Sequence, residues 1–109
     1  MYTKQIDRSL MRTEYGVLVS RLLEHLPNGL RTEFGISIVV VAPGGAVDLH
    51  AHHEHEIWVL ISGHGEYEAD GQKQSISEMT LCYMPPHQKH AIRNISQDIE
   101  LKFLSIWWE

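Results

Sequence analysis

From Gly35 onward the chain consists of short runs of β-branched and aromatic residues, and a turn signal follows each run. This pattern is typical of an all-β sandwich or barrel. The Asp70-Gly71 pair predicts a tight hairpin, because a type I′ turn needs positive φ at both central residues. The expected strands are 36–41, 47–52, 56–62, 66–69, 73–76, 80–84, 90–94 and 101–107.

The segment before Gly35 has a weaker pattern. Residues 15–23 can form a strand, whereas residues 19–26 can also form a short helix that ends before Pro27. A strand followed by a loop is the preferred interpretation. The chain of 109 residues contains no linker and no repeat, so we expect one compact unit. Within it, an N-terminal segment at 1–34 is expected to pack on a barrel or in a dimer, and the barrel itself covers 35–109.

Charge and cysteine content exclude several classes of protein. Nine basic and fourteen acidic residues give a net charge of −5, and no basic block is present, which argues against nucleic acid and anionic membranes as partners. Cys82 is the single cysteine, so no internal disulfide can form, and a reducing compartment is expected. Without a secretory leader or a long apolar run, the expected location is the cytoplasm.

Histidines are concentrated in one part of the chain. Of the eight histidines, seven fall between positions 50 and 90. His50 and His52 lie two apart on an expected strand, so both imidazoles point to one face. Glu56 can return to that face if the intervening residues form a connection, and His90 begins another strand. Three imidazoles and one carboxylate would form a mixed site for a divalent transition metal.

The spacing of these residues resembles two motifs of the cupin family. The first motif is matched at every position, by Gly44, His50, His52, Glu56 and Gly63. The second is matched by Pro85, His90 and Asn94, whereas Met79 and His87 stand where the family has glycine. Because glycine permits a turn with unusual φ, the loop at His87 is expected to be reshaped.

The resemblance implies a cupin-type β-barrel, a double-stranded β-helix or jelly roll, with an internal metal. The ligands would be His50, His52, Glu56 and His90, and the metal would be iron, manganese, nickel or zinc. The implied function is that of a metal-dependent enzyme acting on a small oxygenated substrate, as a lyase, isomerase, cyclase or dioxygenase. The alternative is a non-catalytic cupin that binds or senses a small molecule or a metal.

Two residues are candidates for proton transfer, and three more are expected to line the pocket. His87 can act as an acid, a base or a fifth ligand, or it can be a polar loop residue. Tyr83 is the second candidate. Trp58 and Leu60 share the register of Glu56 and are expected in the pocket, together with Tyr67. Three further histidines are expected outside the site, in solvent: His53, His55 and His64.

Two expected strands are apolar on both faces, at 57–61 and 101–107. One face must pack inside the barrel, so the other needs a cover. Either the N-terminal segment or a second subunit can supply it. The aromatic pair Trp107-Trp108 favours a homodimer.

Overall fold

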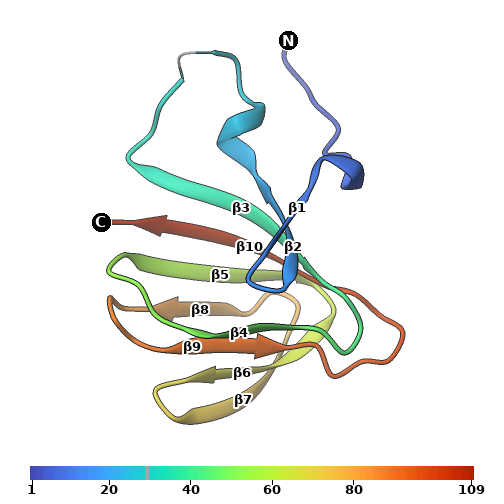
Figure 1. The fold of residues 1–109 in the computed structure, drawn as a ribbon, viewed down its shortest axis with the longest axis vertical. Helices are drawn as coiled ribbons and strands as arrows, with labels where there is room; N and C mark the ends of the chain where they lie inside the picture. The colour runs from blue at the N-terminus through green and yellow to red at the C-terminus, as the bar shows by residue number, and fades with distance from the viewer. Residues whose placement is uncertain (29) are drawn as a thin grey trace.

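The computed structural model describes residues 1–28 and 30–109, which form two facing β-sheets (Figure 1). The larger sheet has six strands in the order β1-β2-β3-β10-β5-β8, and the smaller has four in the order β4-β9-β6-β7. The elements are η1 (Arg8–Leu10), β1 (Arg12–Glu14), β2 (Val17–Arg21), η2 (Leu22–His25), β3 (Phe34–Val41), β4 (Ala46–His50), β5 (His55–Ser62), β6 (His64–Ala69), β7 (Gln72–Ser77), β8 (Leu81–Met84), β9 (His90–Arg93) and β10 (Leu101–Trp108). This arrangement confirms the all-β jelly-roll prediction.

The eight strands expected after Gly35 are all present. The hairpin between β6 and β7 is also confirmed, because Asp70 and Gly71 have φ of 53° and 74° and Ala69 pairs with Gln72. One boundary differs in a way that matters. The second expected strand ran to His52, but β4 ends at His50, where the chain leaves the smaller sheet and crosses to β5 in the larger one. His52 therefore lies on this connection.

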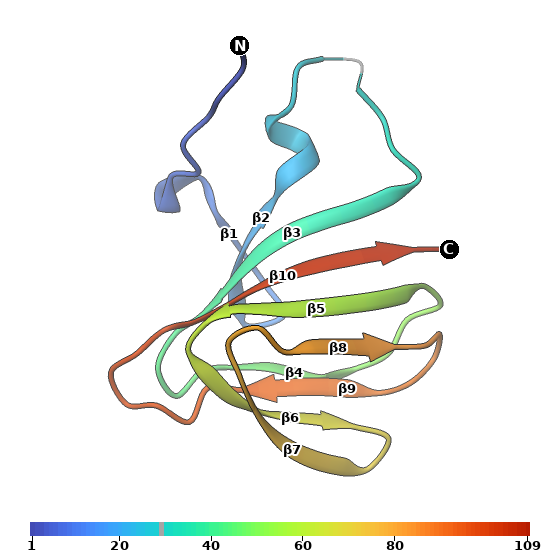
Figure 2. The ribbon, with the colours of Figure 1, turned by 180° about the vertical axis from the view of Figure 1, so that it is seen from behind.

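The N-terminal third adds two strands to the larger sheet. β2 confirms the expected strand, and the short 3₁₀ helix η2 follows it where a loop was expected. β1 was not predicted, because the Tyr15-Gly16 turn lacks the usual asparagine or aspartate, although both residues have positive φ, 52° and 83°. β2 pairs with β3, which places the hairpin at the sheet edge (Figure 2). The division of the chain at residue 35 stays a prediction.

The core lies between the two sheets. Trp58 and Phe103 are its largest buried side chains, and their rings lie 4.6 Å apart between centroids. Inward and outward side chains alternate along β5 and β10, so Ile57 and Leu104 face the outside. Across the described residues, no helix is long and apolar enough to cross a membrane.

Met79 and His87, the two residues that replace motif glycines, both adopt left-handed backbone. Their φ angles are 65° and 67°. A side chain in this region costs about 1 kcal/mol or more, which glycine would avoid. The turn at His87 therefore keeps a backbone conformation suited to glycine, rather than the reshaped loop that the sequence suggested.

Candidate metal centre

Four side chains from three strands and one connection meet at the open end of the sheets. They are His50 at the end of β4, His52 on the connection, Glu56 in β5 and His90 at the start of β9. One potential ligand atom from each lies within 4.8 Å of all the others. Strand pairing explains part of this convergence, since His50 and His90 are direct partners in the β4–β9 pair. This cluster can hold a metal ion.

Backbone carbonyls orient all three imidazoles. The Nδ1 atom of His50 donates to the carbonyl of Asp48 at 2.8 Å, and that of His90 donates to Gln88 at 2.9 Å. His52 does the same to Glu54 at 3.1 Å. Because a carbonyl can only accept, each Nδ1 carries the proton. In the neutral ring each Nε2 then carries the lone pair, which is the protonation state that a metal-ligating histidine needs.

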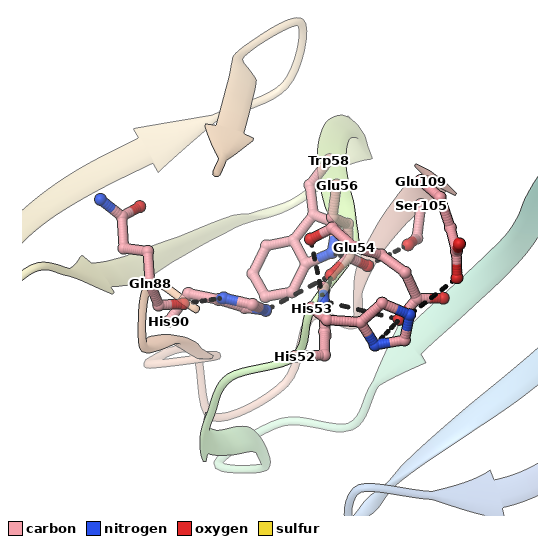
Figure 3. A network of polar contacts seen from close by, with 9 residues as sticks. All are labelled: His52, His53, Glu54, Glu56, Trp58, Gln88, His90, Ser105 and Glu109. Atoms are coloured by element: carbon pink, nitrogen blue, oxygen red, sulfur yellow. Dashed lines mark hydrogen bonds and ion pairs between the residues drawn. The ribbon is translucent and has the colours of Figure 1, made fainter. Parts of the chain in front are cut away.

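Glu56 lies at the centre of the polar network (Figure 3). Trp58 Nε1 donates to Oε2 at 2.9 Å, and Ser105 Oγ donates to the same oxygen. Burial opposes the ionisation of Glu56, but polar contacts with His90, Ser105, His52 and Trp58 outweigh it and lower the pKa to about 2. The carboxylate is therefore charged over the whole physiological pH range, with Oε1 left facing the histidines.

One nitrogen of this cluster, His90 Nε2, is left without a hydrogen bond among the described residues. His52 Nε2 lies 2.7 Å from Glu56 Oε1, and His90 Nε2 lies 3.3 Å from the same oxygen. The His90 nitrogen is buried and, in the part of the chain that the structure describes, has no aligned hydrogen bond. A ring nitrogen and a carboxylate oxygen this close need a proton or a metal ion between them, and buried polar groups are rarely left unpaired. The donor set therefore fits a divalent metal, with three imidazole nitrogens and one carboxylate oxygen.

The structure does not bring the two proton-transfer candidates to the cluster. Tyr83 lies on the outer face of β8, where its hydroxyl is 2.7 Å from Nδ1 of His55. The His87 side chain is exposed, and among the described residues it is not part of the cavity lining. Its backbone N–H has a structural role, because it donates to the His52 carbonyl at 2.7 Å. This bond ties the turn before β9 to the connection that carries His52.

A cavity of about 180 Å³ opens beside the cluster. Trp58 lines it, as expected from the register of Glu56. Leu60 and Tyr67 are not among the described lining residues: Leu60 is fully buried in the core, and Tyr67 packs edge-on against Trp58 with ring centroids 5.9 Å apart. The Tyr67 hydroxyl is buried and has no hydrogen-bond partner among the described residues, and burial raises the pKa of Tyr67.

Sequence reasoning missed the opposite wall of the cavity. It is built by the hairpin of β1 and β2, through Glu14, Tyr15, Val17, Val19 and Arg21. The alternation of the last three along β2 would have placed them on one face, but nothing before Gly35 indicated which sheet they joined.

The remaining histidines lie outside the cluster. His53 is exposed and pairs with Glu109, with Nε2 and Oε1 2.7 Å apart, and this hydrogen bond raises the pKa of His53. His64 is exposed at the start of β6. His55 lies on the outer face, where its ring stacks on Trp108 with centroids 5.5 Å apart. None of the three belongs to the four-residue group found among the described residues.

Comparison with known proteins gives a consistent result. The family model of the Cupin domain matches residues 37–107. The crystal structure of a Cupin 2 conserved barrel domain protein from Salinispora arenicola superposes with a TM-score of 0.88 at 29% identity, covering 100% of this chain and 89% of that one. An uncharacterized protein of Methanocaldococcus jannaschii is 28% identical, over 91% of this chain and 86% of its own length.

One further match is to part of a larger enzyme. A mannose-1-phosphate guanylyltransferase of Escherichia coli is 31% identical over 62 residues, which is 56% of this chain. The match spans only 13% of that enzyme.

Proposed function

The chain belongs to the cupin family, and on that premise we propose that it binds one divalent transition metal and acts as an enzyme on a small oxygenated substrate. The proposed ligands are His50, His52, Glu56 and His90. The observation that carries the proposal is the convergence of the four side chains: three imidazoles whose Nδ1 atoms are held by carbonyls, together with the Glu56 carboxylate, bring four potential ligand atoms within 4.8 Å of one another.

A metal bound here would supply Lewis acidity, either to polarise a carbonyl or to lower the pKa of a bound water. Imidazole and carboxylate ligands suit iron, manganese, nickel or zinc. The protein's own contribution is to fix the ligands and shape the cavity. Ser105 and Trp58 hold Oε2 of Glu56, which leaves Oε1 for the cation.

The cavity supports catalysis or ligand capture in a sheltered space. Tyr15 stacks on His50 from the N-terminal hairpin, and Trp58 forms part of the floor next to Glu56. An enolisable carbonyl or a carboxylate is the class of group that such a metal would bind. The proposed reaction is a lyase, isomerase, cyclase or dioxygenase reaction, and the metal present decides among them.

The first test is the metal content of protein purified without a histidine tag. We expect about one equivalent in the wild type and loss of the metal in His50→Ala. The matched control is His64→Ala, which removes an exposed histidine outside the cluster and should leave the metal in place. Absence of metal from the wild type, even after incubation with each candidate cation, would overturn the proposal.

Turnover separates an enzyme from a binding module. Iron or manganese would direct the substrate screen to dioxygenase reactions, and zinc or nickel to lyase, isomerase or cyclase reactions. Replacing His52 with alanine should abolish both metal and turnover while the sheets stay folded, as judged by circular dichroism. A metal-loaded protein that binds small molecules and turns over none of them would instead support a sensor or binding cupin.

We further propose that the outer face of the larger sheet is covered by a second copy of the chain. This face carries large apolar side chains that are about half exposed, with Ile61 at 47%, Leu81 at 63% and Tyr83 at 49%. A patch of this kind is unusual on a monomer and suits a two-fold interface. Light scattering at micromolar concentration should give a dimeric mass, and Leu81→Lys should shift it to a monomeric mass. A monomeric wild type would end the proposal.

A further inference from the structure

A row of polar side chains crosses the inner face of the larger sheet, from the metal cluster to the N-terminal hairpin. Strand register sets the row: Trp58 pairs with Ser105, Ser105 with Ser37, and Ser37 with Arg21. The row thus passes through β5, β10, β3 and β2. All four of these residues line the cavity. Trp58 and Ser105, the first two members, both donate to Glu56 of the cluster, so the row connects the cluster to the far wall.

Ser37 is the member of this row with an unused polar group. The residue is 2% exposed, and its hydroxyl has no hydrogen-bond partner among the described residues. The neighbouring inward position on β3 is Val39, which belongs to the apolar core. A buried hydroxyl without a partner costs free energy, and native proteins rarely leave one. Because Ser37 lines the cavity, the partner of its hydroxyl has to be supplied from the cavity, by water or by a ligand.

Arg21 and Trp107 form the wall at the far end. The guanidinium makes two hydrogen bonds to Glu14, at 2.6 and 3.1 Å, and its Cζ lies 5.6 Å from the centre of the Trp107 ring. Gly35 makes room for that ring, because a Cβ at this position would lie 2.0 Å from it. The wall is therefore built by specific pairings, and Arg21 is already neutralised by Glu14.

The charges in the cavity argue against an anionic ligand. Among the described residues, the lining has three carboxylates, Glu14, Glu54 and Glu56, and one guanidinium, that of Arg21. With neutral imidazoles this leaves two net negative charges, which one divalent metal would balance. The net charge of the whole chain, these groups included, is −5, which repels anions at long range. Of the two groups proposed above for the metal, this balance favours the uncharged carbonyl over the carboxylate.

We propose that the cavity binds an uncharged, polyhydroxylated compound, with one end at the metal cluster and a hydroxyl group at Ser37 Oγ. This inference rests on the proposed metal site. A hydroxyl group can both donate and accept a hydrogen bond. It can therefore pair with the Ser37 hydroxyl, with the Glu14 carboxylate and with the Arg21 guanidinium. The rings of Tyr15 and Trp107 supply apolar surface for the carbon skeleton.

The test is a titration of the zinc-loaded, ¹⁵N-labelled protein, followed by NMR at the indole N–H of Trp107. The neutral probes are D-xylose and D-glucose, and the matched anions are D-xylonate and D-gluconate. At millimolar concentrations at least one neutral probe should shift the Trp107 signal saturably. In Ser37→Ala the affinity for it should fall about tenfold, as expected for one lost hydrogen bond. Ser75→Ala, at an exposed position on β7, should bind like the wild type.

Each alternative outcome overturns a specific part of the inference. No saturable response to either neutral probe, or a response to the anions alone, would exclude the uncharged ligand class. Equal affinities in wild type and Ser37→Ala would show that only water contacts the hydroxyl. Zinc content is measured on every sample, so failure of the metal site is recognised independently, and the same titration of the metal-free protein still reports on Ser37.

Discussion

Tyr15 and His50 stack face to face, with ring centroids 4.7 Å apart and planes inclined by 18°. Tyr15 belongs to the turn between β1 and β2, and His50 ends β4 in the other sheet. The N-terminal hairpin thus contacts a proposed metal ligand directly. Burial lowers the pKa of His50, which favours the neutral imidazole that a metal needs.

Removing this stack should weaken metal binding without abolishing it. An aromatic pair contributes about 0.5–1.5 kcal/mol, so Tyr15→Ala should lower the metal affinity about three- to tenfold. Competition with a chelator measures the dissociation constant. Tyr15→Phe keeps the ring and should match the wild type. An unchanged constant in Tyr15→Ala would show that the hairpin does not support His50.

Gly35→Ala should destabilise the protein through Trp107. The added Cβ would meet the indole at 2.0 Å, and overpacking of this kind costs about 1–3 kcal/mol. Urea unfolding of Gly35→Ala, Trp107→Ala and the double variant forms a thermodynamic cycle. Replacing Gly35 with alanine should lower the free energy of unfolding by less in the Trp107→Ala background than in the wild type, because the indole is gone. Strict additivity in the cycle would contradict the proposed clash.

Restoring glycine at the two left-handed positions should stabilise the fold. Met79→Gly and His87→Gly each relieve backbone strain and should raise the free energy of unfolding by about 1 kcal/mol or less. His64→Gly, in the regular strand β6, should instead lower it by about 0.5–1 kcal/mol.

The same His87→Gly variant tests whether the His87 imidazole binds the metal. The N–H that bonds the His52 carbonyl is kept, so metal content should stay at the wild-type level. Loss of metal from this variant would mean that His87 acts as a fifth ligand after all.

The pair of Glu14 and Arg21 should contribute stability that depends on pH. Hydrogen bonding to Arg21 lowers the pKa of Glu14 below its ordinary value of 4.5. A lowered pKa in the folded state stabilises above pH 4.5, and this contribution is lost as pH falls through the lowered value. Glu14→Gln should therefore be less stable than the wild type at neutral pH, by at most about 1 kcal/mol, with the gap closing in acid. The difference in the free energy of unfolding is measured with urea from neutral pH into acid. Glu78→Gln, at an exposed position, is the control.

Chelation should leave the two sheets folded. The core around Trp58 and Phe103 lies between the sheets and does not need the cluster for its packing. Far-ultraviolet circular dichroism of the metal-free protein should match that of the loaded protein, while the melting temperature should rise with metal concentration. Complete unfolding on chelation would mean that the metal is structural.

Local sequence signals account for most of the fold. Asp70-Gly71 and the alternating runs after Gly35 are short-range features, and they placed the strands well. The four-residue cluster was also accessible, because His50 and His52 are separated by a strand's period and the motif supplied Glu56 and His90. Tyr83 and Leu60 show the limit of this reasoning. Register assigns a face to each residue, but whether that face borders the cavity, the solid core or solvent depends on both sheets.

The wall opposite the cluster depends on a long-range pairing that no local signal reports. β2 joins β3 across a connection of irregular sequence, and only that pairing aligns Arg21 with Ser37. The unpartnered hydroxyl of Ser37 is likewise visible only once the neighbouring strands are in place.

The metal cluster and the opposite wall of the cavity come from different parts of the chain. The proposed metal ligands come from β4, β5, β9 and one connection, whereas much of the opposite wall comes from an edge hairpin at residues 12–21. Within this hairpin β1 is the edge strand and has a single neighbour, whereas β2 pairs with both β1 and β3. Substitutions in the hairpin would therefore change the wall that faces a ligand while the four proposed metal ligands stay in place. Engineering a new preference should begin at the same ten positions.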